Sequence, residues 1–129
     1  MNGNFLLDTN IVIDLLAGDE NVCRRLTEGA NVVLSSVVLG ELYYGARKSQ
    51  RVEENLARIQ QLADCFDVFA CDSNTAQQYG FLKRQLRNKG RPIPENDIWL
   101  AAIAVQHGLM LVSRDQHFQE VDELTWIVW

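Results

Sequence analysis

The sequence predicts a three-layer α/β/α fold, in which a central, mostly parallel sheet lies between two layers of helices. Its strand segments, such as Val32–Ser35, are continuous apolar runs, which is typical of strands covered on both faces. Helical patterns separate these segments, and this order favours right-handed crossovers between parallel strands. No linker or internal repeat divides the 129 residues, so we expect one domain over residues 1–129.

The first half of the chain alternates strand and helix patterns. Gly18 and Gly29 each follow a helical segment, where glycine accepts the left-handed backbone that ends a helix. Leu56, Ile59 and Leu62 recur at the spacing of one buried helix face. The expected elements are a strand at 4–7, helices at 10–17 and 21–28, a strand at 32–35, and helices at 37–47 and 52–65.

The second half contains clear helix boundaries. Ser73 or Asn74 is suited to cap a long helix, and Gly108 ends another. Pro92 and Pro94 predict an extended loop between these two helices, because proline disfavours helix at the residue before it. The expected elements are a strand at 66–70, helices from 73 or 74 to 88 and from 96 or 97 to 107, a strand at 109–112 and an edge strand at 126–129.

Four acidic residues stand where a strand gives way to a helix: Asp8, Glu41, Asp97 and Asp115. In a parallel sheet such positions converge outside the carboxyl ends of the strands. Carboxylates crowded there would repel each other unless a cation neutralises them. Hard cations such as Mg²⁺ or Mn²⁺ prefer oxygen ligands, so the sequence predicts a divalent-metal site formed by these four acids.

Each acid also has a structural explanation. Asp8 and Asp115 could cap the segments that follow them, and Asp97 lies in a first helical turn, where the helix dipole favours an acid. Glu41 is harder to explain in this way, because its helix is apolar nearly all round and is expected to be buried. A buried carboxylate is costly unless it is paired or bound to metal. The metal site therefore rests on the four acids together.

Short polar side chains accompany the acids. Thr9, Asn10, Ser36 and Ser113 could orient carboxylates or water, or could serve as ordinary caps at strand ends. Asp14 is either an outer acid of the site or a solvent-facing partner for a basic residue.

The charge balance leaves nucleic acid open as a partner. The net charge of −5 argues against it, but two bound divalent cations would add four positive charges and leave −1. The basic residues form clusters that are either a rim beside an acidic centre or solvated helix faces. These clusters are Arg24–Arg25, Arg47–Lys48 with Arg51, and Lys83, Arg84, Arg87, Lys89 and Arg91.

Cysteine and histidine offer little support for other metal chemistry. Cys23, Cys65 and Cys71 show no C-x-x-C spacing, so we expect core or boundary positions and neither a disulfide framework nor a zinc site. His107 and His117 form no H-E-x-x-H pattern. No apolar run could cross a bilayer and no signal-type segment begins the chain, so we expect a cytoplasmic protein without membrane contacts.

Four stretches, in this order, span nearly the whole chain. They are Asp8-Thr9-Asn10 after an apolar run, residues 36–45 (SVVLGELYYG), residues 93–102 (IPENDIWLAA) and residues 111–118 (LVSRDQHF). Together they resemble the PIN domain and, more narrowly, the VapC-type toxins of bacterial toxin–antitoxin pairs.

This resemblance implies a Mg²⁺- or Mn²⁺-dependent endoribonuclease that cleaves RNA with a metal-activated water, leaving a 5′-phosphate and a 3′-hydroxyl. Carried over by position, Asp8, Glu41, Asp97 and Asp115 would be the acidic metal ligands. Thr9 and Ser113 would be supporting hydroxyls. The resemblance also implies a homodimer, possibly within a larger complex, and a small antitoxin whose tail enters the acidic groove.

Two other functions remain as alternatives. A non-catalytic RNA-binding or partner-binding module could keep this fold, although an acidic cleft brings it no benefit. A receiver-like domain also clusters acids at strand ends, but it would need a lysine near the last strands, and residues 109–129 contain none. Tyr43, Tyr44, Trp126 and Trp129 are expected either in core packing or as apolar contacts for a partner.

Overall fold

The computed structural model describes residues 4–129, and its centre is one sheet of five strands in the order β3-β2-β1-β4-β5. Every neighbouring pair is parallel, and Leu6 of β1 pairs with Val33 on one side and Leu111 on the other. The strands are β1 Phe5–Leu7, β2 Val32–Ser35, β3 Val68–Phe69, β4 Met110–Val112 and β5 Thr125–Ile127.

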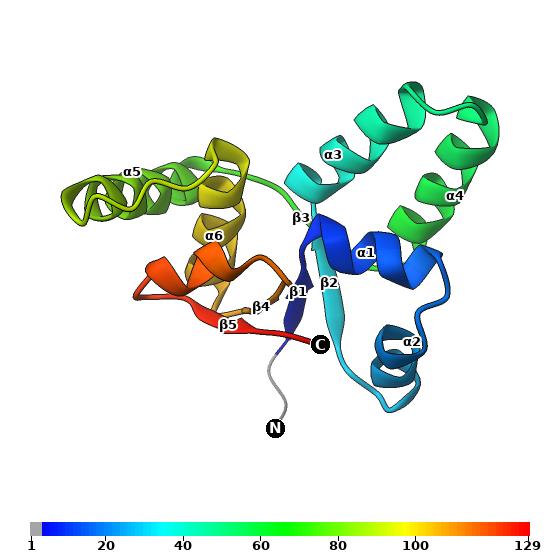
Figure 1. Ribbon diagram of the computed structural model, residues 1–129, viewed down its shortest axis with the longest axis horizontal. Helices are drawn as coiled ribbons and strands as arrows, with labels where there is room; N and C mark the ends of the chain where they lie inside the picture. The colour runs from blue at the N-terminus through cyan, green and yellow to red at the C-terminus, as the bar shows by residue number, and fades with distance from the viewer. Residues whose placement is uncertain (1–3) are drawn as a thin grey trace.

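Helices flank this sheet, which confirms the predicted α/β/α architecture. In Figure 1, α5 and α6 lie beside the β4–β5 end, and α1 to α4 lie beside the β1–β2 side. The helices are α1 Thr9–Leu16, α2 Glu20–Thr27, α3 Ser36–Arg47, α4 Val52–Cys65, α5 Ser73–Asn88 and α6 Glu95–His107, with a short 3₁₀ helix, η1, over Gln116–Glu120. None of the described helices is long and apolar enough to cross a membrane.

The central strands are covered on both faces. All four residues of β2 are buried, and Leu6, Leu34 and Leu111 are fully excluded from solvent. This burial explains the continuous apolar runs, because a strand with helices on both sides has no face that favours polar side chains. Since all the strands are parallel, their carboxyl ends meet at one edge of the sheet, from which the acidic residues project.

The glycines predicted the ends of helices correctly, whereas the residue predicted to cap the start of α5 was wrong. Gly18 and Gly108 follow their helices with φ of 81° and 65°, in the left-handed region. At the start of α5, however, Asp72 is the cap rather than Ser73 or Asn74: its side chain accepts from the main-chain N–H of Thr75, 3.0 Å away. Other helices also start earlier than expected: α1, α2 and α3 each begin one residue before the predicted start, and α6 begins at Glu95, with Pro94 before it. The short helix η1 was not among the predicted helices.

The edge strands are shorter than expected. β3 is confined to Val68–Phe69, although the carbonyl of Asp67 still accepts from the N–H of Leu34 at 2.9 Å. β5 ends at Ile127, before the predicted end at Trp129. Edge strands carry ladder bonds on one side only, so apolar sequence alone defines their ends poorly.

Several burial predictions were wrong. Cys65 and Cys71 are exposed rather than at core or boundary positions, whereas Cys23 is half-buried, as a boundary residue should be. Helix α3 is not buried all round: Val38, Leu42 and Ala46 form its buried stripe, while the side chain of Tyr44 is 68% exposed. Tyr43, Trp126 and Trp129 pack against or within the core, as expected for most aromatics.

Candidate active site

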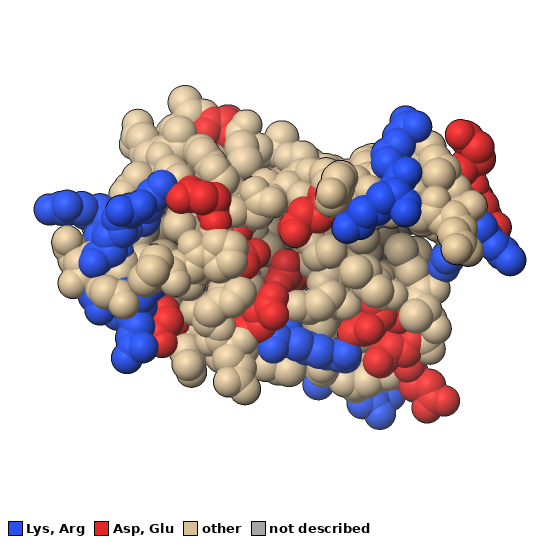
Figure 2. Space-filling model, turned by 45° about the horizontal axis from the view of Figure 1, so that its top comes forward, with Lys and Arg blue, Asp and Glu red and all other residues tan. Residues whose placement is uncertain are grey.

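Asp8, Glu41, Asp97 and Asp115 all line one open hollow of about 580 Å³, which we call the acidic hollow. Asp8 directly follows β1, Glu41 lies in the second turn of α3, Asp97 lies in the first turn of α6, and Asp115 follows β4. Figure 2 shows the acidic side chains gathered in the middle of this face. The structure thus brings the four predicted acids to one place, as parallel topology requires.

Asp8 is the most enclosed of these acids, with only 3% of its surface exposed. One carboxylate oxygen accepts from the main-chain N–H of Thr9 at 2.7 Å, so Asp8 does cap α1, as one of its explanations proposed. The other accepts from the hydroxyl of Ser113, also at 2.7 Å. The side chain therefore has its orientation fixed from two elements, and capping does not remove it from the hollow.

Ser113 and Asn10 connect Asp8 to Asp115. The fully buried hydroxyl of Ser113 accepts from the main-chain N–H of Asp115 at 3.0 Å. The amide nitrogen of Asn10 lies 3.4 Å from Asp8 Oδ2 and 3.3 Å from Asp115 Oδ2. The side-chain oxygen Oδ1 of Asn10 accepts from the main-chain N–H of Arg114 at 3.3 Å, which joins α1 to the segment after β4.

Thr9 performs the corresponding task for Glu41. Its hydroxyl donates to Glu41 Oε1 at 2.9 Å, so α1 holds a carboxylate that belongs to α3. Three of the four predicted supporting side chains, Thr9, Asn10 and Ser113, therefore contact the acids directly.

Ser36 and Asp14 lie outside this network. Ser36 is exposed at the start of α3, and Ser35, not Ser36, accepts the capping hydrogen bond from the N–H of Val38 at 3.2 Å. Asp14 forms an ion pair with Arg114 and is not among the residues that line the acidic hollow. Asp14 is therefore the partner of a basic residue in this structure and not a lining residue of the acidic hollow.

Crowding and burial disfavour negative charge in the hollow. Burial raises the pKa of Asp97 from 3.8 to about 6, and the nearby charge of Asp8 adds to the rise. Burial also raises the pKa of Asp8, although the hydrogen bonds from Ser113 and Thr9 oppose this shift. A bound cation would favour the ionised form of both groups, so the hollow has the electrostatic character of a cation site.

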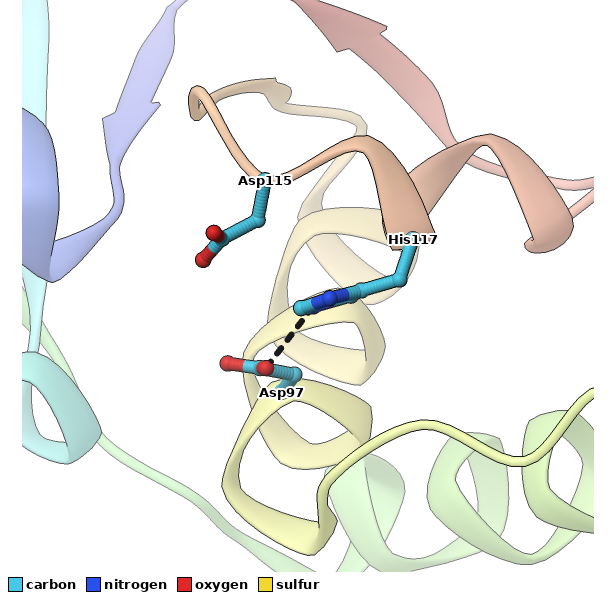
Figure 3. A group of neighbouring side chains, drawn as sticks. All are labelled: Asp97, Asp115 and His117. Carbon is cyan, nitrogen blue, oxygen red and sulfur yellow. Dashed lines mark ion pairs between the residues drawn. The ribbon is translucent and has the colours of Figure 1, made fainter.

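His117 was not predicted as part of the site. Its Nε2 atom lies 2.8 Å from Asp97 Oδ2, and ligand atoms of Asp97, Asp115 and His117 lie within 4.8 Å of one another (Figure 3). The same Nε2 atom is buried and makes no hydrogen bond of regular geometry, so its contact with Asp97 is a short nitrogen–oxygen contact and not a hydrogen bond. Its position two residues after Asp115 was the available signal in the sequence.

Basic side chains flank the acids. Figure 2 shows lysine and arginine over α5 at one end of this face and over the α3–α4 end at the other. Some of these charges are already paired: Lys83 lies 2.6 Å from Glu95, and Lys89 lies 3.1 Å from Asp122. The basic rim that the clusters suggested is present, although part of it belongs to ion pairs on helix surfaces.

The fold and the hollow define a parallel α/β domain with a carboxylate-centred site. Comparison with known proteins agrees, since the PIN domain matches residues 5–124. Ribonuclease VapC2 of Haemophilus influenzae is 35% identical over 128 residues, and a tRNA(fMet)-specific endonuclease VapC of Shigella flexneri is 36% identical over 129, each alignment covering 97% of both chains. The chain belongs to the PIN-domain family and, within it, groups with the VapC ribonucleases.

A solved structure supports the same placement. The chain is similar to one in the crystal structure of VapBC2 from Rickettsia felis bound to a DNA fragment from their promoter. The TM-score is 0.91, the identity is 25%, and the match covers 98% of each chain. The likeness therefore includes the elements that carry all four acids.

Proposed function

We propose that this protein is a divalent-metal-dependent endoribonuclease that acts in the cytoplasm as the toxin of a toxin–antitoxin pair. The observation that carries the proposal is the convergence of Asp8, Glu41, Asp97 and Asp115 on one open hollow. Membership among the VapC ribonucleases supplies the reaction class. The carboxylates that line the hollow support the proposal that the reaction depends on a divalent metal.

The donors of the acidic hollow fit Mg²⁺ or Mn²⁺. Carboxylate oxygens are the ligands that these hard cations prefer, and a bound cation would offset the burial that raises the pKa values of Asp8 and Asp97. When bound, such cations activate water and neutralise charge on the phosphate. His117 would suit Mn²⁺ better than Mg²⁺ if its nitrogen took part, because imidazole binds transition metals more readily.

The protein's own contribution is orientation. Ser113 and the N–H of Thr9 hold the two oxygens of Asp8, and the hydroxyl of Thr9 holds Glu41. These hydrogen bonds keep the carboxylates turned inward before substrate arrives, which limits the reorganisation needed during hydrolysis. Asn10, 3.3 Å from Asp115, would steady the acid that is most exposed to solvent.

The proposed partners are an RNA substrate, a small antitoxin and a second copy of the chain. Likeness to the VapBC2 structure supports an antitoxin. A hollow of about 380 Å³ between α1, α3 and α4 opens beside Glu41 and is lined mainly by apolar groups, including Ile13, Leu16 and Ile59. An apolar segment of the antitoxin would fit there while a basic side chain reaches the acids.

The test is cleavage of total cellular RNA by purified protein freed of antitoxin. Discrete fragments should form with Mg²⁺ or Mn²⁺, disappear with EDTA, and be absent with Asp8→Asn or Asp97→Asn. End analysis should find 5′-phosphates and 3′-hydroxyls. A folded, metal-supplied wild-type protein that cuts no RNA would overturn the nuclease and favour the non-catalytic binding module.

A further inference from the structure

A second hollow, of about 650 Å³, adjoins the acidic hollow on the side of α3. The two share Thr9, Glu41 and Asn96 as lining residues, so they form one continuous depression. Beyond the shared residues, α3 lines the second hollow with Ser36, Gly40 and Tyr44. We call it the Tyr44 hollow, and the proposed hydrolysis assigns no role to it.

Tyr44 is an unusual residue to leave in solvent. Its side chain is 68% exposed, and the ammonium of Lys48 lies 4.7 Å from the centre of its ring. A large aromatic side chain that is exposed beside a functional depression indicates a binding surface, because its apolar area is not buried within the protein itself. Its ring is available to a planar ligand, and the cation over it suits an anionic one.

The space beside Tyr44 is kept open by glycine. Gly40 lies one helical turn before Tyr44, and a Cβ atom placed on it would meet nothing within 4 Å. Because Gly40 has no side chain, nothing projects from this position of α3 into the hollow beside Tyr44. Asn96, exposed at the opposite wall, adds an amide that can both donate and accept hydrogen bonds.

The charge around the Tyr44 hollow is mixed, because Glu41 is its only charged lining residue and the positive charge lies farther along α3. Figure 2 shows lysine and arginine at the α3–α4 end of the face. Lys48 and the neighbouring Arg47 are both exposed. An aromatic platform beside a cationic surface is the usual arrangement for holding unpaired nucleotides, because bases stack while phosphates meet positive charge.

We propose that the Tyr44 hollow binds an unpaired nucleotide of the RNA next to the scissile phosphate, with its base stacked on Tyr44, its edge facing Asn96 and its phosphate near Lys48. This inference rests on the proposed ribonuclease function and deepens it, since it limits the substrate to single-stranded RNA at this position. A base held in a duplex cannot present its face to Tyr44, so helical RNA is excluded from the hollow.

The experiment measures RNA binding without cleavage. A fluorescein-labelled oligoadenylate of about 12 nucleotides is titrated with Asp8→Asn protein, in which cleavage should be lost and the acidic hollow carries one negative charge fewer. In this background, Tyr44→Ala should weaken binding about tenfold and Tyr44→Phe should bind like the parent, because the ring and not the hydroxyl stacks. Binding of the matched adenylate–uridylate duplex should not change.

Two glycines of α3 provide a matched control. Gly40 and Gly45 are both helical and both have open space at the Cβ position, but Gly45 lines the apolar hollow on the other side of Glu41. Gly40→Leu should weaken oligoadenylate binding as Tyr44→Ala does, and Gly45→Leu should not. Lys48→Gln should reduce the slope of log affinity against log salt concentration by the amount expected for about one phosphate contact.

Unchanged oligoadenylate affinity in both Tyr44→Ala and Gly40→Leu would overturn the inference and would point to a protein partner on this surface. Equal weakening of single-stranded and duplex RNA by Tyr44→Ala would also overturn it, since stacking would then not be the cause. Failure of the wild-type protein to cleave RNA would count against the proposed function alone, because this binding assay requires no cleavage.

Discussion

His117 Nε2 lies 2.8 Å from Asp97 Oδ2, which joins η1 to the first turn of α6 at one of the acids that line the acidic hollow. The imidazole acts against the other influences on Asp97: it lowers the pKa of this carboxyl, while burial and the charge of Asp8 raise it more. The contact therefore favours the ionised carboxylate that a cation needs. It also fixes the direction in which that carboxylate faces.

His117→Asn should reduce Mn²⁺ affinity about tenfold, because loss of a residue that orients a metal ligand typically has an effect of this size. Isothermal titration calorimetry of the metal-free protein measures this affinity directly. If the imidazole itself binds metal, the loss should be larger for Mn²⁺ than for Mg²⁺.

His107→Asn is the matched control for this experiment. His107 packs edge-on against Phe69, with ring centroids 4.6 Å apart, and has no part in the acidic hollow. Its replacement should leave Mn²⁺ affinity unchanged. Equal affinities for wild type and His117→Asn would show that the contact with Asp97 has no role in metal binding.

Asp97→Asn should abolish RNA cleavage and yet stabilise the metal-free protein near neutral pH. At that pH the carboxylate is ionised although burial and Asp8 oppose its charge, and a neutral amide removes this repulsion. We expect a gain of about 1 kcal/mol in the free energy of unfolding, less than the full pKa shift implies, because the contact with His117 is lost too.

Urea unfolding in EDTA tests this prediction, with Mn²⁺ added in a parallel series. The gain should vanish in Mn²⁺, because the metal stabilises the wild-type protein and not the variant. A variant less stable than wild type in EDTA would mean that Asp97 is held mainly by its contact with His117.

The convergence of the acids was predictable because it follows from topology. Once the strands are parallel, residues that follow β1, β2 and β4 must meet at one edge, whatever the details of packing. Asp8, Glu41 and Asp115 were found in this way, and Asp97 by its place at the start of a helix. Thr9 and Ser113 were identified because they lie next to Asp8 and two residues before Asp115, but their hydroxyls donate to Glu41 and Asp8, which are distant in sequence.

Contacts that depend on local backbone geometry were not predictable in this way. His117 reaches Asp97 only because residues 116–120 form a 3₁₀ turn, which has no strong sequence pattern. The exposure of Tyr44 depends on which stripe of α3 faces the core, and an almost wholly apolar helix does not specify that stripe. Ser36 was misplaced for a similar reason, because its neighbour Ser35 holds the capping position.

Asp14→Asn should leave Mn²⁺ affinity unchanged and lower stability by about 0.5 to 1 kcal/mol, as for a partly exposed ion pair. Asp14 pairs with Arg114, whose guanidinium also lies within 3.4 Å of the main-chain oxygen of Trp129. Calorimetric titration and urea unfolding of the same preparation separate the two effects. A marked loss of metal affinity would instead make Asp14 an outer acid of the site.

Asp72→Ala should lower the stability of the protein, because it removes the cap of α5 and leaves the N–H of Thr75 without its acceptor. Ser73→Ala and Asn74→Ala are the controls, and each should cost little, since neither residue is the cap. Thermal unfolding of the three variants gives the comparison. A larger loss for Ser73→Ala or Asn74→Ala than for Asp72→Ala would contradict the observed cap.

The metal-free protein should lose stability through Asp97 as the pH rises from about 4 to about 6. In the folded protein Asp97 keeps its proton up to a pKa of about 6, whereas an ordinary aspartate releases it near 3.8. Between these values the folded state binds more protons than the unfolded state, so the free energy of unfolding falls with rising pH. Above about pH 6 the stabilising contribution of Asp97 is gone, and the free energy of unfolding no longer changes with pH through this group.

Comparison with Asp97→Asn isolates this contribution from those of other carboxylates. Glu95, for example, has a lowered pKa, and its contribution to stability changes with pH in the opposite direction. In EDTA, the wild-type free energy of unfolding minus that of the variant should therefore decrease as the pH rises from about 4 to about 6. With Mn²⁺ present the sign should reverse, because metal and protons compete for the same carboxylate. Parallel curves for the two proteins in EDTA would show that burial and Asp8 do not raise the pKa of Asp97.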